Sequence, residues 1–489
     1  MAQSLPHYIN GAWLEGSGPS MQSINPATGE VSSSFRTLNP TELNHAVGAA
    51  YFAFDVWVDL GVEKRIGILN RYAAELKARK TDLAQTISQE TGKPLWESLG
   101  EVDAMINKVP LSIEAHTMRR SEESRPTPDA QAITRFKPHG VAAVLGPFNM
   151  PGHLPNGHIV PALLAGNTIV FKSSEYTPRI ANKMAECFEA GGLLKGVMSV
   201  IHGARETGSA LATHRDIDAI FFTGSAAAGI AINKANAHRP GLILALEMGG
   251  NNPLVIWDVA DLKAAALLTI QSAFITSGQR CSCARRLIIP QDGQPFLNQL
   301  IELTRQIRVG PHTDRPEPFM GPVISDAAAQ TLLKAQANLI NLGGKPLLEM
   351  RSTGPRPAFL TPGIIDVTDV VDLPDEEHFG PLLQVIRVAS SDAAIAEANK
   401  TRYGLCAGLL SDDRGRFDQF YRQVRAGVIH WNRPTTGASS MLPFGGIGES
   451  GNHRPAGYWS ADYSSYPVAL LESDKLRLPA TMPPGIELK

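Results

Sequence analysis

The side chain most suited to covalent chemistry is the thiol of Cys281, which follows the segment Ser277-Gly278-Gln279-Arg280. A Gly-Gln pair just ahead of a cysteine predicts a tight backbone turn, where nearby N–H groups can set the reactivity of the thiol. Most free cysteines are instead small core residues, and Cys283 lies only two positions further on. A soft-metal pair is a third interpretation, although no His or further Cys lies nearby in the sequence to complete it.

Two other segments offer groups that could assist a nucleophile. Glu247 ends an entirely apolar run and is followed by Gly249 and Gly250. Burial at such a position raises the pKa of a carboxylate, which suits a general base. Asn149, in Gly146-Pro147-Phe148-Asn149-Met150-Pro151, carries an amide that could donate to a developing oxyanion. Each residue also has a structural interpretation, as a paired glutamate at a strand end or as an asparagine of a turn.

A further group of residues suits a nucleotide. Glycine-rich segments at 203–208 and 224–229 follow apolar runs, and each could open a helix whose N-terminus faces an anion. Neither segment has the G-x-G-x-x-G or the P-loop pattern. Lys172 and Glu175 follow another apolar run and together could hold a sugar diol as donor and acceptor.

Composition limits the class of protein. The 489 residues suffice for about three domains at roughly 150 residues each. A formal charge of −2 gives no electrostatic footprint for nucleic acid or an anionic membrane. The four cysteines cannot form a disulfide framework and lack zinc-site spacing. No apolar stretch approaches the roughly 20 residues that span a bilayer. We therefore expect a globular, cytoplasmic protein without a metal and without nucleic-acid or membrane partners.

The elements that would position these residues alternate between strands and helices. The chain begins with a helix that Asn39 caps, followed by one long helix over 66–91. Short apolar runs then predict strands at 141–145, 168–171, 198–201, 219–222 and 242–246, with helices near 178–190, 205–213 and 225–236. This alternation is typical of a parallel sheet covered on both faces, with ligands at the carboxyl ends of its strands.

A second alternation predicts another α/β unit, with strands at 253–257, 286–290, 383–388 and 427–431. Between the early helices and the first sheet, the polar segment 119–131 is expected to be a surface connection. Residues 133–137 alternate like an exposed strand. The tail 467–480 has a similar short pattern and could pair with that strand, so both look like subunit contacts.

In order along the chain, these motifs resemble those of the NAD(P)-dependent aldehyde dehydrogenase superfamily. The matching residues are Asn149, Lys172, Glu175, Gly224–Gly229, Glu247, Cys281, Glu377-His378-Phe379-Gly380-Pro381 and Pro443-Phe444-Gly445-Gly446. The resemblance implies an α/β fold of two parallel-sheet domains and a small β oligomerisation element, in a homodimer or a dimer of dimers. It assigns 1–124 and 140–246 to NAD binding, 247–455 to catalysis, and 125–139 and 456–489 to oligomerisation.

The resemblance also implies a role for each residue. Cys281 would attack the aldehyde carbon, Asn149 and the backbone N–H of Cys281 would hold the oxyanion, and Glu247 would activate the water that hydrolyses the thioester. The cofactor would contact Lys172, Glu175, Gly224, Ser225, Ala226, Ala227, Ala228, Gly229, Glu377 and Phe379. Glu175 favours NAD over NADP, because a carboxylate accepts from a free 2′-hydroxyl and repels a 2′-phosphate, although the nearby Lys172 weakens this preference.

Within the superfamily, segments 278–286, 433–440 and 450–455 are most similar to the semialdehyde dehydrogenases of the bacterial arginine succinyltransferase pathway. Their substrate is a small anionic aldehyde with two carboxylates, which calls for a cationic channel. The candidate substrate contacts are Arg280, Ser282, Arg433 and Arg454, and each arginine could instead form a surface or interdomain ion pair.

Two other functions fit the same motifs. In CoA-acylating semialdehyde dehydrogenases, CoA rather than water takes the acyl group, and the glutamate that corresponds to Glu247 is typically lacking. A non-catalytic structural protein on this fold tends to lose the thiol or the base. Because this chain has Cys281, Glu247 and Asn149, we favour the hydrolytic enzyme.

Overall fold

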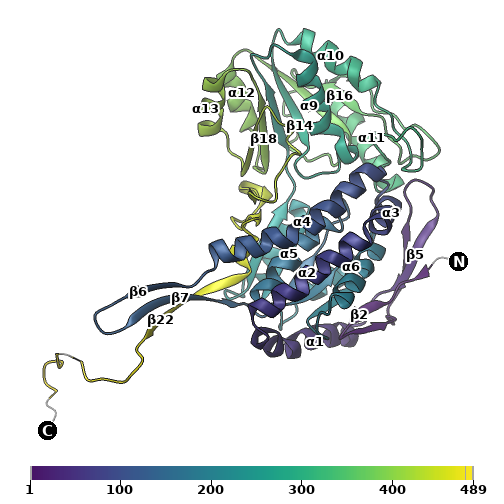
Figure 1. The fold of residues 1–489 in the computed structure, drawn as a ribbon. Coiled ribbons are helices and arrows are strands. Elements are labelled where there is room, and N and C mark those ends of the chain that lie inside the picture. Colours follow the sequence, from purple (N-terminus) through teal and green to yellow (C-terminus); the bar gives the residue numbers. More distant parts are fainter. Residues whose placement is uncertain (1–2, 480, 487–489) are drawn as a thin grey trace.

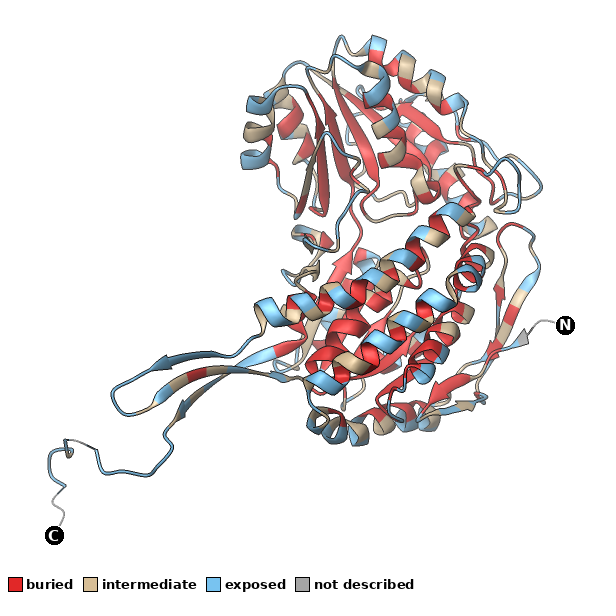
Figure 2. Ribbon diagram, in the orientation of Figure 1, coloured by how far each residue is buried: buried red, intermediate tan, exposed pale blue. Residues whose placement is uncertain are grey.

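Two seven-stranded sheets organise the chain in the computed structural model, which describes residues 3–479 and 481–486. Each sheet forms the centre of one lobe and is covered by helices, and a narrow arm projects from the lobe that contains the first sheet (Figure 1). Buried residues concentrate in the sheets and on the helix faces that pack against them, as Figure 2 shows.

The first sheet has the strand order β12-β11-β8-β9-β10-β2-β3. Its strands are β2 (His7–Ile9), β3 (Ala12–Leu14), β8 (Val141–Leu145), β9 (Thr168–Lys172), β10 (Met198–Ile201), β11 (Ala219–Gly224) and β12 (Ile243–Met248). All five strands predicted between 141 and 246 are confirmed and pair in parallel, whereas β2 and β3 are antiparallel additions at one edge. β8, β9 and β10 are buried along their whole length, as their unbroken apolar runs predict.

Helices cover both faces of this sheet. They are α1 (Pro40–Asp59), α2 (Val62–Ala78), α3 (Lys80–Thr91), α4 (Leu95–Arg119), α5 (His153–Ala165), α6 (Pro178–Ala190), α7 (Arg205–Ala212) and α8 (Ala226–Asn236). α1 begins with the predicted capping box between Asn39 and Glu42. The single helix predicted over 66–91 is wrong: α2 and α3 are separate helices, because the backbone at Arg79 leaves the helical region. α3 ends, as predicted, at Gly92 in a left-handed conformation.

Residues 95–119 form the 25-residue helix α4, for which no element is predicted from the sequence. Charged side chains lie on the buried face of α4, including Glu97, Glu101 and Lys108, and Pro110 lies inside the helix. A hydrophobic pattern therefore does not reveal it. The segment 119–131, predicted to be only a surface connection, contains the strand β6 (Glu123–Pro126).

The second sheet has the order β15-β16-β17-β14-β13-β18-β19, in which only the edge strand β15 is antiparallel. Its strands are β13 (Asn252–Ile256), β14 (Ala284–Pro290), β15 (Lys345–Leu348), β16 (Gly363–Asp366), β17 (Leu382–Val388), β18 (Cys406–Leu410) and β19 (Val428–Trp431). Its helices are α9 (Leu262–Phe274), η1 (Ile275–Gly278), α10 (Gln294–Arg305), α11 (Asp326–Asn341), α12 (Ser391–Ala398) and α13 (Arg414–Gln423). The four predicted strands are confirmed as β13, β14, β17 and β19.

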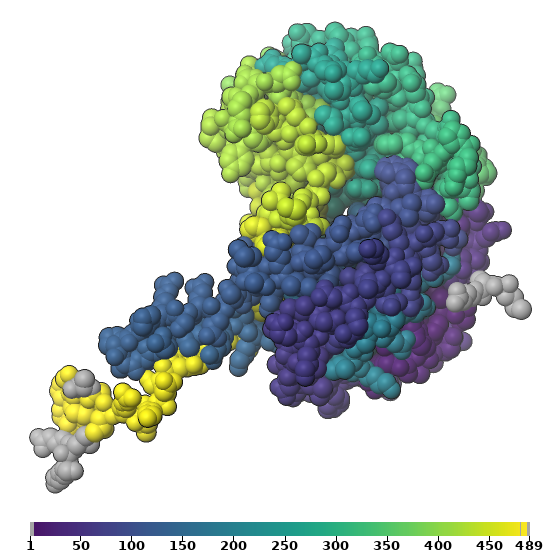
Figure 3. Space-filling model, viewed as in Figure 1, coloured from purple at the N-terminus to yellow at the C-terminus, as the bar shows by residue number. Residues whose placement is uncertain are grey.

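The arm is a three-stranded antiparallel sheet in which β7 (Gln131–Pro138) lies between β6 and β22 (Ser465–Glu472). Tyr466 is paired with Lys137 and Leu470 with Ile133, so the predicted pairing of the tail with residues 133–137 is confirmed. The arm stands clear of both lobes (Figure 3) and is largely exposed. The roles of the lobes and the arm in cofactor binding, catalysis and oligomerisation stay predictions from the resemblance.

Short elements complete the chain. They are β1 (Gln3–Ser4), β4 (Ser20–Ile24), β5 (Val31–Arg36), β20 (Pro443–Phe444), η2 (Gly448–Ser450), β21 (Ala456–Gly457) and α14 (Ser460–Tyr463). β20 and β21 form a small ribbon in the stretch of chain that leads from the second lobe back to the arm. Among the helices of the described residues, none has both the length and the apolar character to cross a membrane.

Candidate active site

Cys281 lies on the connection between α9 and β14, directly after a backbone turn in an unusual conformation. Thr276 and Ser277 have φ angles of 55° and 54°, in the left-handed region that side chains with a Cβ disfavour. Gly278 continues with φ of 71°, and a Cβ there would lie 2.1 Å from the carbonyl oxygen of Gly380. The turn predicted ahead of the thiol is present, and its glycine has no room for a side chain.

Buried hydrogen bonds hold this left-handed turn. The Glu97 carboxylate accepts from the backbone N–H of Thr276 at 2.9 Å and from its hydroxyl at 2.8 Å. The Ser277 hydroxyl donates to the carbonyl of Gly321 at 2.7 Å, and the Gln279 amide donates to the Thr276 carbonyl at 3.1 Å. These contacts offset the cost of the backbone conformation, which is about 1–3 kcal/mol for a residue in a sparsely populated region.

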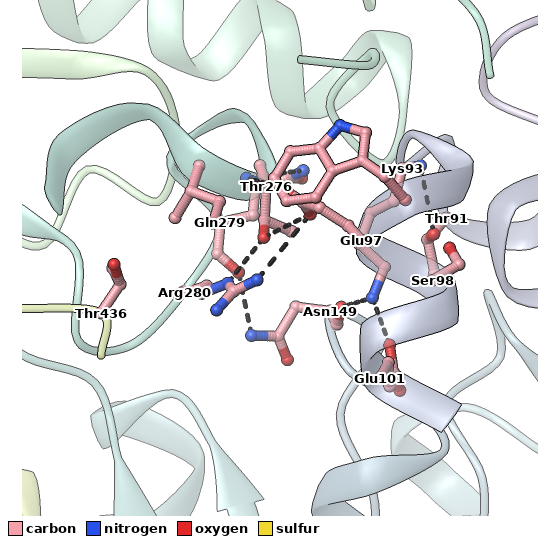
Figure 4. Close-up of polar contacts among 12 residues, drawn as sticks. Thr91, Lys93, Glu97, Ser98, Glu101, Asn149, Thr276, Gln279, Arg280 and Thr436 are labelled. Atoms are coloured by element: carbon pink, nitrogen blue, oxygen red, sulfur yellow. Dashed lines mark hydrogen bonds and ion pairs between the residues drawn. The ribbon is translucent and has the colours of Figure 1, made fainter. Parts of the chain in front are cut away.

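Asn149 follows β8 and reaches the same turn. Its side-chain amide donates to the carbonyl of Gln279 at 2.9 Å, which leaves the second N–H of the amide for another acceptor (Figure 4). Its backbone carbonyl accepts from the Lys93 ammonium at 3.0 Å, and Lys93 forms a buried ion pair with Glu101. The other Glu101 oxygen accepts from the N–H of Gly152 at 2.8 Å. The Asn149 loop is therefore fixed to α4 at two points.

Glu247 lies near the carboxyl end of β12, beside Thr223 of β11. One oxygen accepts from the backbone N–H of Ala456 at 3.3 Å, whereas the buried Oε2 has no hydrogen-bond partner among the described residues. Burial raises the pKa of this carboxyl well above its ordinary value. A carboxylate with an unused buried oxygen and a raised pKa is suited to accept a proton from water.

Only one of the two neighbouring thiols reaches the cavity that holds these groups. Cys281 is partly exposed and lines the cavity, whereas Cys283 is fully buried. Burial, together with the charges of Glu377 and Glu247, raises the pKa of the Cys281 thiol to about 12. The thiol is therefore protonated at neutral pH and must lose its proton to a base before it can attack.

Cys281, Asn149 and Glu247 all line one cavity. Its other lining residues are Lys108, Met150, His153, Leu154, Gly157, His158, Thr223, Arg280, Ser282, Thr436, Ala438, Ser439, Ser440, Phe444, Ala456 and Gly457. The structure thus brings together the predicted nucleophile, oxyanion amide and base, which come from the connection before β14, from the loop after β8 and from β12.

A second cavity lies at the carboxyl ends of the strands of the first sheet. Lys172, Glu175, Ser225, Ala227 and Ala228 line it, and the Lys172 ammonium lies 3.6 Å from the Glu175 carboxylate. Burial lowers the pKa of Lys172, an effect that the charge of Glu175 opposes. The cavity thus combines a donor, an acceptor and a helix N-terminus, as a nucleotide requires.

The remaining predicted cofactor residues of this segment, Gly224, Ala226 and Gly229, surround the start of α8 without lining the cavity. Ser225 caps α8, because its hydroxyl accepts from the N–H of Ala228 at 3.3 Å. A Cβ at Gly229 would lie 2.3 Å from the sulfur of Met248. The glycine therefore allows α8 to pack closely on β12.

Glu377, a predicted cofactor contact, has a buried carboxyl group. Its Oε1 is buried and has no hydrogen-bond partner among the described residues, although the Arg285 guanidinium lies 3.8 Å away. Burial raises the pKa of this carboxyl. A Cβ at Gly249 would lie 1.7 Å from its other oxygen, so this glycine allows Glu377 to approach. The ring of Phe379 lies 5.5 Å from the Arg285 guanidinium.

The four predicted substrate contacts are not brought together. Arg280 and Ser282 line the cavity of Cys281. Arg433 and Arg454 are exposed and are absent from its lining; Arg454 borders a separate depression beside the arm. The Arg280 guanidinium donates to the Thr276 hydroxyl at 2.7 Å and lies 3.9 Å from Glu97 (Figure 4).

Sequence analysis missed the contributions of α4, namely Glu97, Glu101 and Lys108. The only signal was their spacing of four and seven residues, which places them on one face of a helix. The soft-metal interpretation of Cys281 and Cys283 gains no support, because residues 3–479 and 481–486 contain no group of three potential His, Cys, Asp or Glu ligands.

Comparison with known proteins agrees with this arrangement. Residues 13–467 match the sequence model of the aldehyde dehydrogenase family. The chain belongs to the aldehyde dehydrogenase family. This family uses NAD or NADP. The cavity that Cys281, Asn149 and Glu247 line is therefore a cavity of an aldehyde dehydrogenase.

Individual aldehyde dehydrogenases are similar over nearly the whole chain. The N-succinylglutamate 5-semialdehyde dehydrogenase of Ectopseudomonas mendocina (strain ymp) is 52% identical over 99% of this chain and 99% of its own. The crystal structure of an NAD-dependent aldehyde dehydrogenase from Sinorhizobium meliloti aligns with a TM-score of 0.92 at 25% identity, covering 99% of this chain and 97% of that one. The structure of the 1-pyrroline-5-carboxylate dehydrogenase from Thermus with bound NAD aligns with a TM-score of 0.90 at 30% identity. The alignment covers 96% of this chain and 93% of that one.

The buried pair of Lys93 and Glu101 leads to a prediction about stability. Lys93→Met leaves the Glu101 charge buried and unpaired, so we expect the free energy of unfolding to fall by about 3–5 kcal/mol. Lys80→Met is the matched control, because it breaks the exposed pair with Asp103 between α3 and α4, which is worth about 0–1 kcal/mol. Urea unfolding followed by circular dichroism measures both. Equal losses in the two variants would contradict the role assigned to the buried pair.

The two thiols lead to a second prediction. Cys281→Ala should abolish dehydrogenase activity and leave NAD binding intact, because its thiol lines the substrate cavity. Cys283→Ala should retain most activity, since its buried thiol is not part of the cavity lining and donates to the backbone carbonyl of Ile275 at 3.9 Å. NADH formation and calorimetric NAD titration test both variants. A comparable loss of turnover in both would indicate that the thiols act as a pair.

Proposed function

We propose that this aldehyde dehydrogenase oxidises N-succinylglutamate 5-semialdehyde to N-succinylglutamate with NAD, as a step of arginine catabolism. The observation that carries the proposal is the 52% identity over 99% of both chains to an enzyme of that name. The cavity supports it, because Lys108 and Arg280 supply two cationic groups beside the nucleophile, whereas a neutral aliphatic aldehyde needs none. Arg280 and Ser282 are the proposed substrate contacts nearest to Cys281.

The first half of the reaction depends on Cys281 and Asn149. The thiol loses its proton to solvent through the cavity that it lines, and Glu247 is not needed until the second half. The sulfur then bonds to the aldehyde carbon, and the carbonyl oxygen becomes an oxyanion. The free N–H of the Asn149 amide and the backbone N–H of Cys281 donate to that oxygen. Donors held in place before the reaction stabilise the developing charge without reorganisation.

The second half depends on Glu247. NAD, when bound, accepts the hydride that leaves the tetrahedral carbon, so that a thioester on Cys281 remains. Glu247 takes a proton from a water molecule as the water oxygen bonds to the thioester carbon. The carbon–sulfur bond then breaks, the acid is released and Cys281 leaves as a thiolate. The unused Oε2 of Glu247 is available for this proton.

The residues present suit NAD. Lys172 and Glu175 would hold the adenosine ribose, and the segment from Gly224 to Gly229 at the start of α8 would lie beside the pyrophosphate. Glu377, with its unpartnered buried oxygen, would accept from the nicotinamide ribose, and Phe379 would contact the cofactor as well. Glu175 favours NAD because a carboxylate accepts from a free 2′-hydroxyl.

We also propose that the protein is a homodimer or a dimer of dimers that uses the arm. In the arm, β6 and β22 are the two edge strands on either side of β7. The arm also exposes apolar side chains such as Leu471, which is 76% exposed and which a second copy of the chain could cover. A cytoplasmic location accords with its four free cysteines.

The choice of substrate is tested by NADH formation with a panel of aldehydes. We expect the highest kcat/KM with N-succinylglutamate 5-semialdehyde and much lower values with unsuccinylated glutamate semialdehyde and with pentanal. The reaction should proceed without CoA, because Glu247 activates water. A dependence on CoA would contradict hydrolysis, and equal kcat/KM for the charged and neutral aldehydes would contradict the assigned substrate.

The role of Glu247 is tested by Glu247→Gln. We expect one rapid burst of NADH followed by slow turnover, lowered roughly 10²- to 10⁴-fold, because hydride transfer precedes hydrolysis. Stopped-flow absorbance separates the two phases. If the burst disappears together with steady-state turnover, Glu247 acts earlier, by removing the proton from Cys281.

The pH profile gives an independent test of the same residue. A base works when deprotonated, and burial raises the pKa of Glu247. The rate of thioester hydrolysis in the native enzyme should therefore rise with pH through that raised pKa and level off above it. In Glu247→Gln this rise should be absent, and an unchanged profile would assign the pH dependence to another group.

A further inference from the structure

The cavity of Cys281 contains a cation that the mechanism above does not use. Lys108 projects from α4 and is 2% exposed. Its ammonium donates to the carbonyl of Gly457 at 2.6 Å and forms no ion pair with any carboxylate of the described residues. Lys93, near the start of the same helix, is equally buried but is paired with Glu101. Lys108 is therefore a buried cation without a counter-charge.

A buried ammonium without an anionic partner is costly, and such lysines are rare in folded proteins. The cost appears in its titration, since burial lowers the pKa of Lys108 to about 8. An ammonium has three N–H donors, and the carbonyl of Gly457 uses one. The other two have no partner among the described residues, and because Lys108 lines the cavity, a carboxylate bound there would supply both the missing charge and the missing acceptors.

Glu247, the one carboxylate that lines the same cavity, forms no ion pair with Lys108, and no other titratable group of the lining supplies a negative charge. His158 is engaged by the Tyr463 hydroxyl at 2.7 Å and the Thr223 hydroxyl at 3.1 Å, and burial lowers its pKa to about 3. His153 has an unpartnered Nδ1, and burial lowers its pKa to about 4. Both rings are thus neutral at pH 7. Arg280, the other cation of the lining, already has Glu97 at 3.9 Å.

We propose that Lys108 determines specificity by binding one carboxylate of the substrate, while Arg280 faces the other. This inference rests on the proposed function, because a substrate with two carboxylates is what two cations in one cavity would suit. Lys108 thus selects anionic aldehydes by charge and takes no part in bond making or breaking. The pairing is strongest where water is excluded, as around this buried side chain.

The test compares Lys108→Met, Lys108→Gln and Lys108→Arg with the native enzyme. Each is assayed with N-succinylglutamate 5-semialdehyde, which carries two carboxylates, and with neutral pentanal. We expect Lys108→Met and Lys108→Gln to lower kcat/KM for the dianionic aldehyde roughly 10- to 100-fold, because a hydrogen bond to a charged group is lost. The loss should come mainly from a higher KM. The kcat/KM for pentanal should change less than about twofold in each variant. Lys108→Arg should keep most of the native activity toward the dianionic aldehyde.

Two variants control for structural effects. Gln keeps an amide donor for the Gly457 carbonyl but lacks the charge, so it separates the charge from the contact between α4 and β21. Lys64→Met makes the same substitution at an exposed lysine of α2 and should leave both substrates unchanged. Thermal melting identifies any variant that does not fold. If Lys108→Met does not fold, the comparison is made with Lys108→Gln and Lys108→Arg.

The outcomes separate this inference from the proposed function. If the native enzyme does not prefer the dianion over pentanal, the proposed function fails, and this inference fails with it. If the native enzyme prefers the dianion and the Gln variant keeps that preference, only the role of Lys108 is overturned. A fall in kcat that is equal for both aldehydes would also overturn it, because that result is typical of a lysine that only supports the structure around Glu247.

Discussion

The geometry of the active site depends on the buried ion pair between Lys93 and Glu101. Its cation also donates to the backbone of Asn149, and its anion accepts from the N–H of Gly152. Neither partner can be removed without leaving the other charge uncompensated in a site closed to water. The loop that carries the oxyanion amide is therefore fixed to α4 by charge as well as by packing.

The same helix holds the turn that precedes Cys281. Glu97 lies one turn before Glu101 and binds the backbone and the hydroxyl of Thr276, which begins the left-handed turn before Cys281. At this end of α4, Trp96 donates its backbone N–H to Glu317 of the second lobe at 2.8 Å. One helix of the first lobe thus sets how far the thiol lies from the amide, although these two groups belong to different lobes.

Sequence reasoning recovered most of both sheets, because buried parallel strands are continuous apolar runs with clear ends. The glycine neighbours of Cys281 and Glu247, which mark a tight turn and a close approach, singled out two residues that the structure brings into one cavity. Sequence reasoning missed α4, since the buried face of that helix carries Glu97 and Lys108, so its pattern is that of a solvated surface. It grouped Arg454 with Arg280, because charge alone does not reveal which arginine faces a cavity and which faces water.

A short stretch of chain joins Ala456, which contacts Glu247, to the arm. Ala456 donates to Glu247, and β22 begins at Ser465 and pairs along β7. Asp462, between them, is bonded to Arg119 at the end of α4. The packing of the arm and the contact of Ala456 with Glu247 therefore depend on the same few residues. A substitution in this stretch that shifts one of these contacts would displace the other as well, so the two cannot be adjusted separately.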